Sequence, residues 1–228
     1  MKLTPDTLEV LKNFSTINPG IFIKPGKIIK TIGKNKNILA EYSSEEEFKQ
    51  KFGIYELNNL LSILSLEKDI PEIEFDSNKN SMKIATLSGR RKIEYRFCDE
   101  EMITTPPEKG IQMPAPEISF DLSQDDFNSI DKAARVLGST NISVNSDGEK
   151  VFVNTYDASN DSTSTSQLEI AQGNGDVYNM IFKEEAWKMI PGNYSVNISS
   201  KGVAHFKHKE KALQYWITIE PGSSYTGK

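Results

Sequence analysis

The sequence contains few of the residues that support catalysis, metal binding or covalent cross-linking. Among 228 residues there are one cysteine, Cys98, and two histidines. A single cysteine excludes an internal disulfide and is typical of a reducing compartment. His205 and His208 are three residues apart in a predicted strand, so they point to opposite faces and are poorly placed to share a metal. Cys98 has no histidine nearby in sequence, and we interpret it as an inert thiol at a strand end.

The chain also lacks a long apolar run and an excess of basic residues. No apolar run approaches the roughly 20 residues of a membrane helix, and the N-terminus does not resemble a signal peptide, so we expect a cytoplasmic protein. The 27 Lys and Arg residues against 32 Asp and Glu residues leave a net charge of −5. This balance disfavours a conventional DNA-binding domain with a basic face.

Other polar stretches are interpreted as structural. The acidic runs SSEEEF and CDEEM are typical of solvated faces, although their carboxylates could bind a cation. The stretch GNGD, residues 173–176, leads into a predicted strand and therefore indicates a hairpin turn rather than a phosphate-binding loop. The sequence thus predicts no catalytic constellation, no metal site and no cofactor.

Two stretches, LTPDTL at residues 3–8 and LSQDDF at residues 122–127, predict the same helix start once in each half. In each, a hydroxyl side chain, Thr4 or Ser123, can accept a hydrogen bond from an N–H of the first turn. Pro5 suits the first helical position, and aspartates follow at the positive end of the helix dipole. Apolar residues then recur at helical spacing, which predicts one buried face per helix: Leu8, Leu11 and Phe14 in the first, Phe127, Ile130, Ala133, Ala134 and Leu137 in the second.

The two halves also share most of their predicted order of elements. After the first helix come short strands, a leucine-rich helix at residues 54–66, and three strands at 71–75, 81–87 and 90–97. The second half has a strand, the helix, several strands, a short helical segment at 183–189, and three final strands. Between them lies a stretch without periodicity that contains four prolines. We therefore predict a duplicated α+β fold, with domains at 1–98 and 117–228 and a connector at 99–116.

Five basic residues lie off the apolar stripes of the predicted helices or within the short helical segment: Lys12, Lys132, Arg135, Lys183 and Lys188. Periodicity alone favours ordinary solvated helix surface for all five.

Three long blocks carry a resemblance to a known family. LKNFSTINPGIFIKPG, IYELNNLLSILSL and KMIPGNYSVNISSKG strongly resemble the sliding clamp, the DNA polymerase processivity factor, of T-even-type bacteriophages. The order and spacing agree from Met1 to about Pro221. The resemblance implies two clamp-fold domains per chain and three chains closed head to tail into a ring, with sheets outside and helices lining a hole for duplex DNA.

The resemblance also implies function and partners. Such a ring has no enzymatic activity of its own, is opened by an ATP-dependent clamp loader and tethers the replicative DNA polymerase. In these phages it also contacts a late-transcription sigma factor and co-activator, all in the cytoplasm of the infected bacterial host. An acidic chain fits this role, because a closed ring stays on DNA by topology, and weak phosphate contacts allow it to slide.

With the family in view, site residues can be assigned as expectations. The five basic residues named above would face DNA. The subunit interface would join Arg91, Ile93 and Tyr95 to Gln167 and Glu169 through unpaired strand edges. A pocket for partner peptides would be formed by six residues, although these could also only hold the domains together: Tyr42, Ile111, Met113, Pro114, Ile219 and Pro221.

Two other functions stay open on the residues alone. One is a metal-dependent nucleotide-processing enzyme that uses acidic residues such as Glu100 and Glu101. The other is a purely structural ring protein, such as a virion component.

Overall fold

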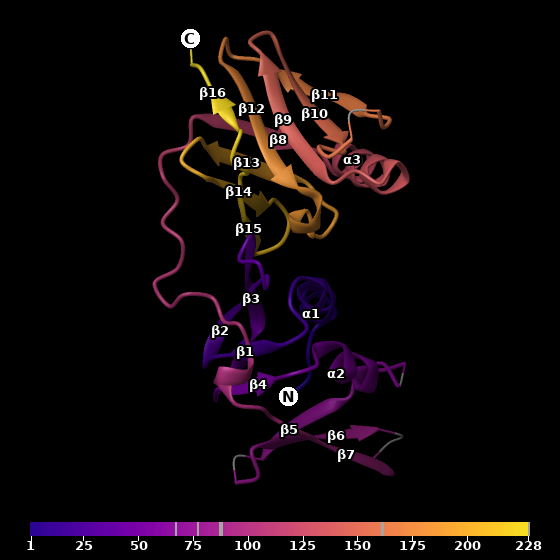
Figure 1. Cartoon of the computed structure of the whole chain (residues 1–228). Coiled ribbons are helices and arrows are strands. Elements are labelled where there is room, and N and C mark those ends of the chain that lie inside the picture. Colours follow the sequence, from indigo (N-terminus) through magenta and orange to yellow (C-terminus); the bar gives the residue numbers. More distant parts are fainter. Residues whose placement is uncertain (67, 77, 87–88, 161, 228) are drawn as a thin grey trace. The chain divides into compact units, whose positions relative to one another are not determined.

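The computed structural model describes residues 1–66, 68–76, 78–86, 89–160 and 162–227. The chain forms two compact units, Met1–Glu108 and Lys109–Lys228. In Figure 1 the colours run along the sequence, from indigo at the start of unit 1 to yellow at the end of unit 2. The division falls inside the proline-containing segment 99–116. Within the described ranges, no helix combines the length and the apolar character needed to cross a membrane.

The described residues of unit 1 form two α-helices and small antiparallel sheets. β2 pairs with β3, β1 pairs with β4, and β5, β6 and β7 form a three-stranded sheet with β6 in the middle. The two helices pack against each other (Figure 1). In chain order the elements are α1 (Pro5–Ile17), β1 (Ile21–Ile23), β2 (Gly26–Ile32), β3 (Ile38–Phe48), β4 (Phe52–Ile54), α2 (Leu57–Leu64), β5 (Glu72–Asp76), β6 (Ser81–Thr86), β7 (Arg91–Arg96) and the 3₁₀ turn η1 (Glu100–Met102).

Helix α1 starts as its sequence predicts, but its buried face is slightly different. The Thr4 hydroxyl accepts a hydrogen bond from the Thr7 N–H at 3.2 Å, and Pro5 occupies the first turn. The expected stripe is wrong at Leu8, which is only half-buried, whereas Thr7 is fully buried. A threonine can take this place because its hydroxyl has a carboxylate partner, Glu46.

The leucine-rich helix and the three strands after it are confirmed, except that residue 87 at the end of the second predicted strand lies outside the described residues. Every leucine at the predicted spacing in α2 is buried. Across β5, β6 and β7 the row Ile73, Ile84 and Ile93 lies on one face, and charged residues occupy the other face. The alternation of side chains along each strand therefore separates core from solvent in this sheet.

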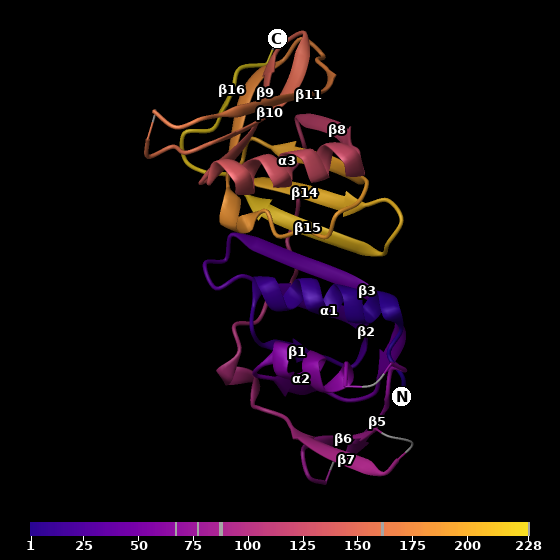
Figure 2. The same cartoon turned by 90° about the vertical axis from the view of Figure 1, so that its right-hand side faces the viewer.

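The described residues of unit 2 form one α-helix and two antiparallel sheets. The first sheet has the strand order β11, β10, β9, β12, β16, and in the second β8, β13, β14 and β15 pair in succession. Helix α3 packs on β10 and β11 (Figure 2). The elements are β8 (Ile118–Leu122), α3 (Gln124–Leu137), β9 (Asn141–Asp147), β10 (Lys150–Tyr156), β11 (Ser166–Gln172), β12 (Val177–Lys183), the 3₁₀ turn η2 (Glu184–Ala186), β13 (Tyr194–Ser199), β14 (Val203–His208), β15 (Leu213–Thr218) and β16 (Ser224–Tyr225).

An aromatic cluster joins α3 to both sheets of unit 2. The ring of Phe127 on α3 lies 6.2 Å from that of Trp187 and 5.8 Å from that of Tyr194. Trp187 in turn lies 6.0 Å from Phe182 of β12 and 5.3 Å from Phe206 of β14. All five side chains are buried. Each large apolar side chain contributes about 1.5–3 kcal/mol on burial, so this cluster is a main source of the stability of unit 2.

The predicted short helix at 183–189 is wrong. The structure has only the 3₁₀ turn η2, with Lys183 in β12 and Lys188 beyond the turn. Pro191 and Gly192 follow closely, and so short a segment cannot offset the cost of starting an α-helix.

The predicted hairpin at residues 173–176 is also wrong. β11 and β12 are not neighbours, because β10 and β9 lie between them in the sheet. The segment instead crosses the end of the β9–β10 hairpin, where Gly173 N–H donates to the Glu149 carbonyl at 2.7 Å and Gly175 N–H to the Gly148 carbonyl at 2.9 Å. A Cβ on Gly173 would lie 2.4 Å from the Gly148 carbonyl oxygen, so this close crossing requires glycine.

Candidate functional site

Among the described strands, β7 of unit 1 and β11 of unit 2 each have a neighbour on one side only. β7 is an outer strand of the three-stranded sheet of unit 1, and β11 is an outer strand of the five-stranded sheet of unit 2. The opposite edges are partly covered. Met1 exchanges two backbone hydrogen bonds of 2.7 Å with Ile73 of β5, and β16 pairs with β12. A free edge is a template for a further strand, so β7 and β11 are the places where another chain can continue these sheets.

The edge strand β7 carries both apolar and basic side chains. Ile93 and Tyr95 are half-buried, and Arg91 is exposed. The Tyr95 hydroxyl donates to the Glu56 carbonyl at 3.3 Å, and burial raises the pKa of its phenol. An added strand would complete the burial of Ile93 and Tyr95.

The edge strand β11 is polar where the sequence predicts an interface. Gln167 and Glu169 are exposed on it. The Glu169 carboxylate forms an ion pair of 2.7 Å with Lys150 of β10, and this contact raises the pKa of the Lys150 ammonium. Glu169 therefore already has a cationic partner within its own unit.

The basic residues on the α-helices are exposed but accompanied by acidic ones. Lys12 and Lys132 are exposed on α1 and α3. Arg135 is exposed as well, and its guanidinium forms a two-pronged contact with the Asp131 carboxylate, Nη2 to Oδ2 at 2.9 Å and Nε to Oδ1 at 3.2 Å. On α3, Arg135 therefore already has an acidic partner one turn away.

The other two predicted basic residues lie elsewhere in unit 2. Lys183 alternates with the buried Phe182 along β12, so it points to the face of the sheet opposite the aromatic core and α3. Its ammonium lies 3.9 Å from the Glu220 carboxylate. Lys188 is half-buried after η2. The structure therefore does not bring Lys183 to the same surface as Lys132 and Arg135.

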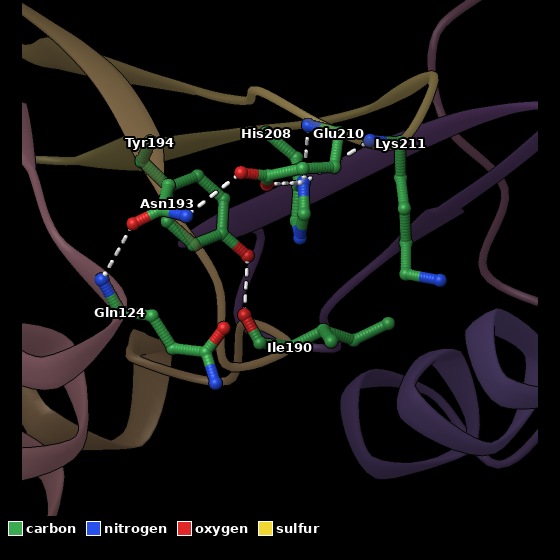
Figure 3. A network of polar contacts seen from close by, with 7 residues as sticks. All are labelled: Gln124, Ile190, Asn193, Tyr194, His208, Glu210 and Lys211. Atoms are coloured by element: carbon green, nitrogen blue, oxygen red, sulfur yellow. Dashed lines mark hydrogen bonds and ion pairs between the residues drawn. The ribbon is translucent and has the colours of Figure 1, made fainter.

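A polar network holds the start of α3 against the second sheet of unit 2 (Figure 3). The Asn193 side-chain oxygen accepts from the Gln124 N–H at 2.9 Å, and its amide nitrogen donates to the Glu210 carboxylate at 2.7 Å. The buried His208 uses Nδ1 to accept from the backbone N–H groups of Glu210 at 3.1 Å and Lys211 at 3.2 Å. These contacts orient α3 from its first residue.

The six residues predicted to bind partner peptides differ in exposure. Tyr42 belongs to β3 of unit 1 and is buried. The other five belong to unit 2, where Ile111 is 38% exposed, Pro221 is exposed, and the remaining three are half-buried: Met113, Pro114 and Ile219.

Sequence reasoning missed the role of Glu46, which belongs to an acidic run interpreted as solvated. Its carboxylate accepts a hydrogen bond from the Thr7 hydroxyl at 2.6 Å and another from the Thr4 N–H. Burial raises the pKa of the Glu46 carboxyl, but these hydrogen bonds outweigh burial and hold it below its usual value of 4.5. No sequence pattern predicts this contact, because Glu46 lies where the pairing register of β2 and β3 shifts, at residues 44–47 of β3.

Cys98 and the two histidines lie in different local surroundings. Burial raises the pKa of the Cys98 thiol, which keeps it protonated near neutral pH. His205 Nε2 contacts Gln214 Oε1 at 2.9 Å, while His208 belongs to the network above. Across the ranges that the structure describes, no three His, Cys, Asp or Glu residues are grouped so as to hold a metal ion.

Comparisons with known proteins identify the family. The model of the family "DNA polymerase processivity factor" matches residues 4–105, and that of "gp45 sliding clamp, C terminal" matches residues 119–221. The sliding clamps of Escherichia phage RB69 and Enterobacteria phage T4 are each 30% identical to this chain, over 99% of it and 99% of their own length. The chain belongs to the sliding-clamp family of DNA polymerase processivity factors. The resemblance found in the three sequence blocks is thereby confirmed.

Solved structures confirm the fold of this sliding clamp. The proliferating cellular nuclear antigen of Entamoeba histolytica matches with a TM-score of 0.70 at 15% identity, over 94% of this chain and 95% of the other. The Helicobacter pylori beta clamp, solved bound to a DNA ligase peptide, matches with a TM-score of 0.69 at 13% identity, over 96% of this chain and 65% of the other. The predicted α+β fold class with two clamp-type domains is therefore correct.

Proposed function

We propose that this sliding clamp closes as a homotrimeric, head-to-tail ring around duplex DNA and tethers the replicative DNA polymerase. The observation that carries the proposal is the pair of free strand edges, β7 in unit 1 and β11 in unit 2. Because these edges belong to different surfaces of the chain, their pairing is heterologous, and heterologous contacts with the right rotation generate rings. Ile93 and Tyr95 then meet the edge that carries Gln167 and Glu169.

The proposed ring binds DNA without reading its sequence. A chain with a net charge of −5 is suited to topological retention rather than to strong phosphate binding. Weak phosphate contacts that let the ring slide come from Lys12, Lys132, Arg135 and Lys188. Lys183, the fifth predicted DNA-facing residue, lies on β12 and points away from α3. No catalytic activity or cofactor is required of the clamp itself.

The proposed partners follow from the family. They are an ATP-dependent clamp loader, the polymerase, and a late-transcription sigma factor with its co-activator, acting in the cytoplasm of an infected bacterial host. Support comes from phage relatives that are named sliding clamp and that match this chain over 99% of their own length. The partner-peptide residues Ile111, Met113, Pro114, Ile219 and Pro221, with Tyr42, remain the proposed docking set.

Sedimentation of the purified chain tests the ring. The wild type should sediment as a trimer at a concentration where Ile93→Glu, which places a charge on the free edge of β7, sediments as a monomer. Val177→Glu is the matched control, because Val177 is 46% exposed on a strand whose outer edge is partly covered. A monomeric wild type at every concentration, or equal loss of the trimer in both variants, contradicts the proposed interface.

A processivity assay on primed circular DNA, with cognate polymerase, loader and ATP, tests the DNA-facing residues. Reversing Lys132 and Arg135 together to glutamate should shorten the products while the trimer persists. Lys183→Glu should leave product length unchanged, since Lys183 lies on the other face of its sheet. Equal shortening by both changes would refute the assignment of the α3 surface to DNA.

A further inference from the structure

The α-helices of this chain carry more acidic than basic residues. α1 has two acidic residues against one basic residue, and α2 has no charged residue. α3 has three aspartates against two basic residues, which leaves the helix with a net charge of −1. Each cation on these helices therefore supplies a large share of their attraction to phosphate, and a carboxylate beside that cation reduces the attraction.

Asp131 lies beside one of these cations, Arg135, one helical turn away on α3. Both oxygens of its carboxylate are engaged, because Oδ2 lies 2.9 Å from Nη2 of Arg135 and Oδ1 accepts a hydrogen bond from Nε at 3.2 Å. A two-pronged contact fixes the plane of a guanidinium as well as its position. The same fork of N–H groups fits a phosphate, so Asp131 occupies the part of Arg135 that DNA would use.

The two partners differ in their exposure to solvent. The side chain of Asp131 is 24% exposed, whereas that of Arg135 is 73% exposed. Asp131 is therefore partly enclosed by the protein, and the guanidinium is accessible from outside while it is held. Because a solvent-exposed ion pair is worth little, a phosphate can take the place of Asp131 on Arg135 without a large cost.

Lys132 provides a comparison on the same helix. It is exposed, and it follows Asp131 directly in the sequence. Consecutive residues of an α-helix point about 100° apart, whereas residues four apart lie on the same face. Arg135, rather than Lys132, is therefore the cation of α3 whose contact with DNA depends on Asp131.

We propose that Asp131 weakens the contact between α3 and DNA by competing with phosphate for Arg135. The guanidinium then exchanges between the Asp131 carboxylate and successive phosphates, so that leaving one phosphate does not leave the cation without a partner. Asp131 is a positioning residue in this scheme, because it acts on DNA only through Arg135. The inference rests on the proposed function, since it requires the exposed face of α3 to meet DNA inside a ring.

Single-molecule tracking of the ring on DNA tests the proposal. Dye-labelled rings are placed on stretched duplex DNA with blocked ends by the cognate loader and ATP, and their diffusion coefficient is measured. Asp131→Asn should lower the diffusion coefficient by about threefold near 50 mM salt, and the difference should shrink by about 200 mM, because phosphate contacts weaken as salt rises. Asp131→Glu keeps a carboxylate one turn from Arg135 and should remain close to the wild type. Sedimentation should show a trimer for every variant.

Further variants separate the ion pair from the charge of the helix. Asp125→Asn is the matched control, because it removes the same charge from α3 at a point about 15 Å from Arg135 along the helix axis. It should change diffusion much less than Asp131→Asn. Arg135→Gln should raise the diffusion coefficient, and adding Asp131→Asn to it should have no further effect. Adding Asp131→Asn to Lys132→Gln should still slow the ring.

NMR of the clamp without DNA tests the pair by itself. The Nε–H proton of Arg135 should exchange slowly with solvent in the wild type, because it is held by Oδ1 of Asp131. Asp131→Asn should speed this exchange several-fold, and Asp125→Asn should leave it unchanged. This measurement requires neither a loader nor sliding on DNA.

Three outcomes overturn the proposal. Sliding of Asp131→Asn at the wild-type rate, while Arg135→Gln slides faster, would mean that Asp131 does not compete with phosphate. Equal slowing by Asp131→Asn and Asp125→Asn would mean that the total charge of α3 matters and the pair does not. Slowing by Asp131→Asn in the absence of Arg135 would mean that Asp131 acts through another residue.

Failure of the proposed function gives a different result. In that case neither Arg135→Gln nor Lys132→Gln changes sliding, or the wild-type ring does not remain on DNA. The inference then falls together with the assignment of α3 to DNA, although the slow exchange of the Arg135 Nε–H remains.

Discussion

The link between Glu46 and the start of α1 leads to a prediction about the stability of unit 1. Replacing Glu46 with alanine removes an acceptor for two hydrogen bonds, from the Thr7 hydroxyl at 2.6 Å and from the Thr4 N–H. Hydrogen bonds to charged groups contribute about 1.5–3 kcal/mol each. Because Glu46 is half-buried and solvent offsets part of the loss, we expect Glu46→Ala to cost about 2–3 kcal/mol in the free energy of unfolding.

The milder change Glu46→Gln separates charge from hydrogen bonding. Glutamine keeps one acceptor oxygen but loses the charge, so we expect a cost of about 1–2 kcal/mol. Glu45→Gln and Glu47→Gln are matched controls, since both are exposed in the same acidic run and should change stability by less than about 0.5 kcal/mol. The double variant with Thr7→Val should cost less than the two single changes added together, because both remove the same contact.

The effect of Glu46 also depends on pH in a defined direction. Its folded pKa lies below its usual value of 4.5, so the unfolded state binds a proton more readily. The stabilisation is therefore complete above about pH 5 and is lost as the pH falls through the folded pKa. The gap between wild type and Glu46→Gln should close over that same interval.

The placement of the tryptophans makes the assay specific to one unit. Trp187 and Trp216 both lie in unit 2, so tryptophan fluorescence reports that unit, whereas amide hydrogen exchange along α1 reports unit 1 directly. Glu46→Ala should speed exchange in α1 by at least tenfold, as about 1.4 kcal/mol corresponds to a factor of ten. Unchanged exchange in α1, or an equal shift in the fluorescence transition, would refute the reasoning.

Further predictions concern unit 2, each measured by urea unfolding followed by tryptophan fluorescence. Phe127→Ala should cost about 3–5 kcal/mol, because it opens a cavity beside Trp187, and a cost below about 1 kcal/mol would contradict the described core. Gly138→Ala should cost about 1 kcal/mol, since Gly138 ends α3 at a φ of 61°, and no cost would mean that the left-handed end is not maintained. Asn193→Ala should cost about 1–2 kcal/mol through its lost contacts with Gln124 and Glu210, and Asn193→Asp should not recover this loss, because it places a second carboxylate against that of Glu210.

Local signals predicted the elements that depend on local physics. Thr4 and Ser123 cap their helices through the expected hydroxyl contacts, because capping requires only residues three apart. The alternation of Ile93 and Tyr95 with charged residues likewise predicted β7, since side-chain direction alternates in any strand.

Features set by distant contacts escaped prediction. Lys183 looks like part of a helix in sequence, but the pairing of β12 with β9 extends the strand through it. The pairing of β11 with β10 rather than with β12 cannot be read from the glycines around Asn174, which suit a hairpin and a crossing equally. The predicted site residues divide in the same way. The alternation of side chains places Ile93 and Tyr95 on a strand, whereas the position of Lys183 on the face of its sheet opposite α3 depends on how α3 packs.

The crossing at residues 173–176 has a consequence for how unit 2 folds. β9, β10 and β11 form a meander whose pairings join residues close in the chain, but β12 must return to β9, where Val177 meets Asp147 and Lys183 meets Asn141. Pairings between distant residues carry a larger loop-closure cost and form late. During refolding, β9 has an open side until β12 pairs with it, and β12 has one until β16 pairs with it. β16 thus lies along one side of the sheet and leaves β11 as the outer strand on the other side.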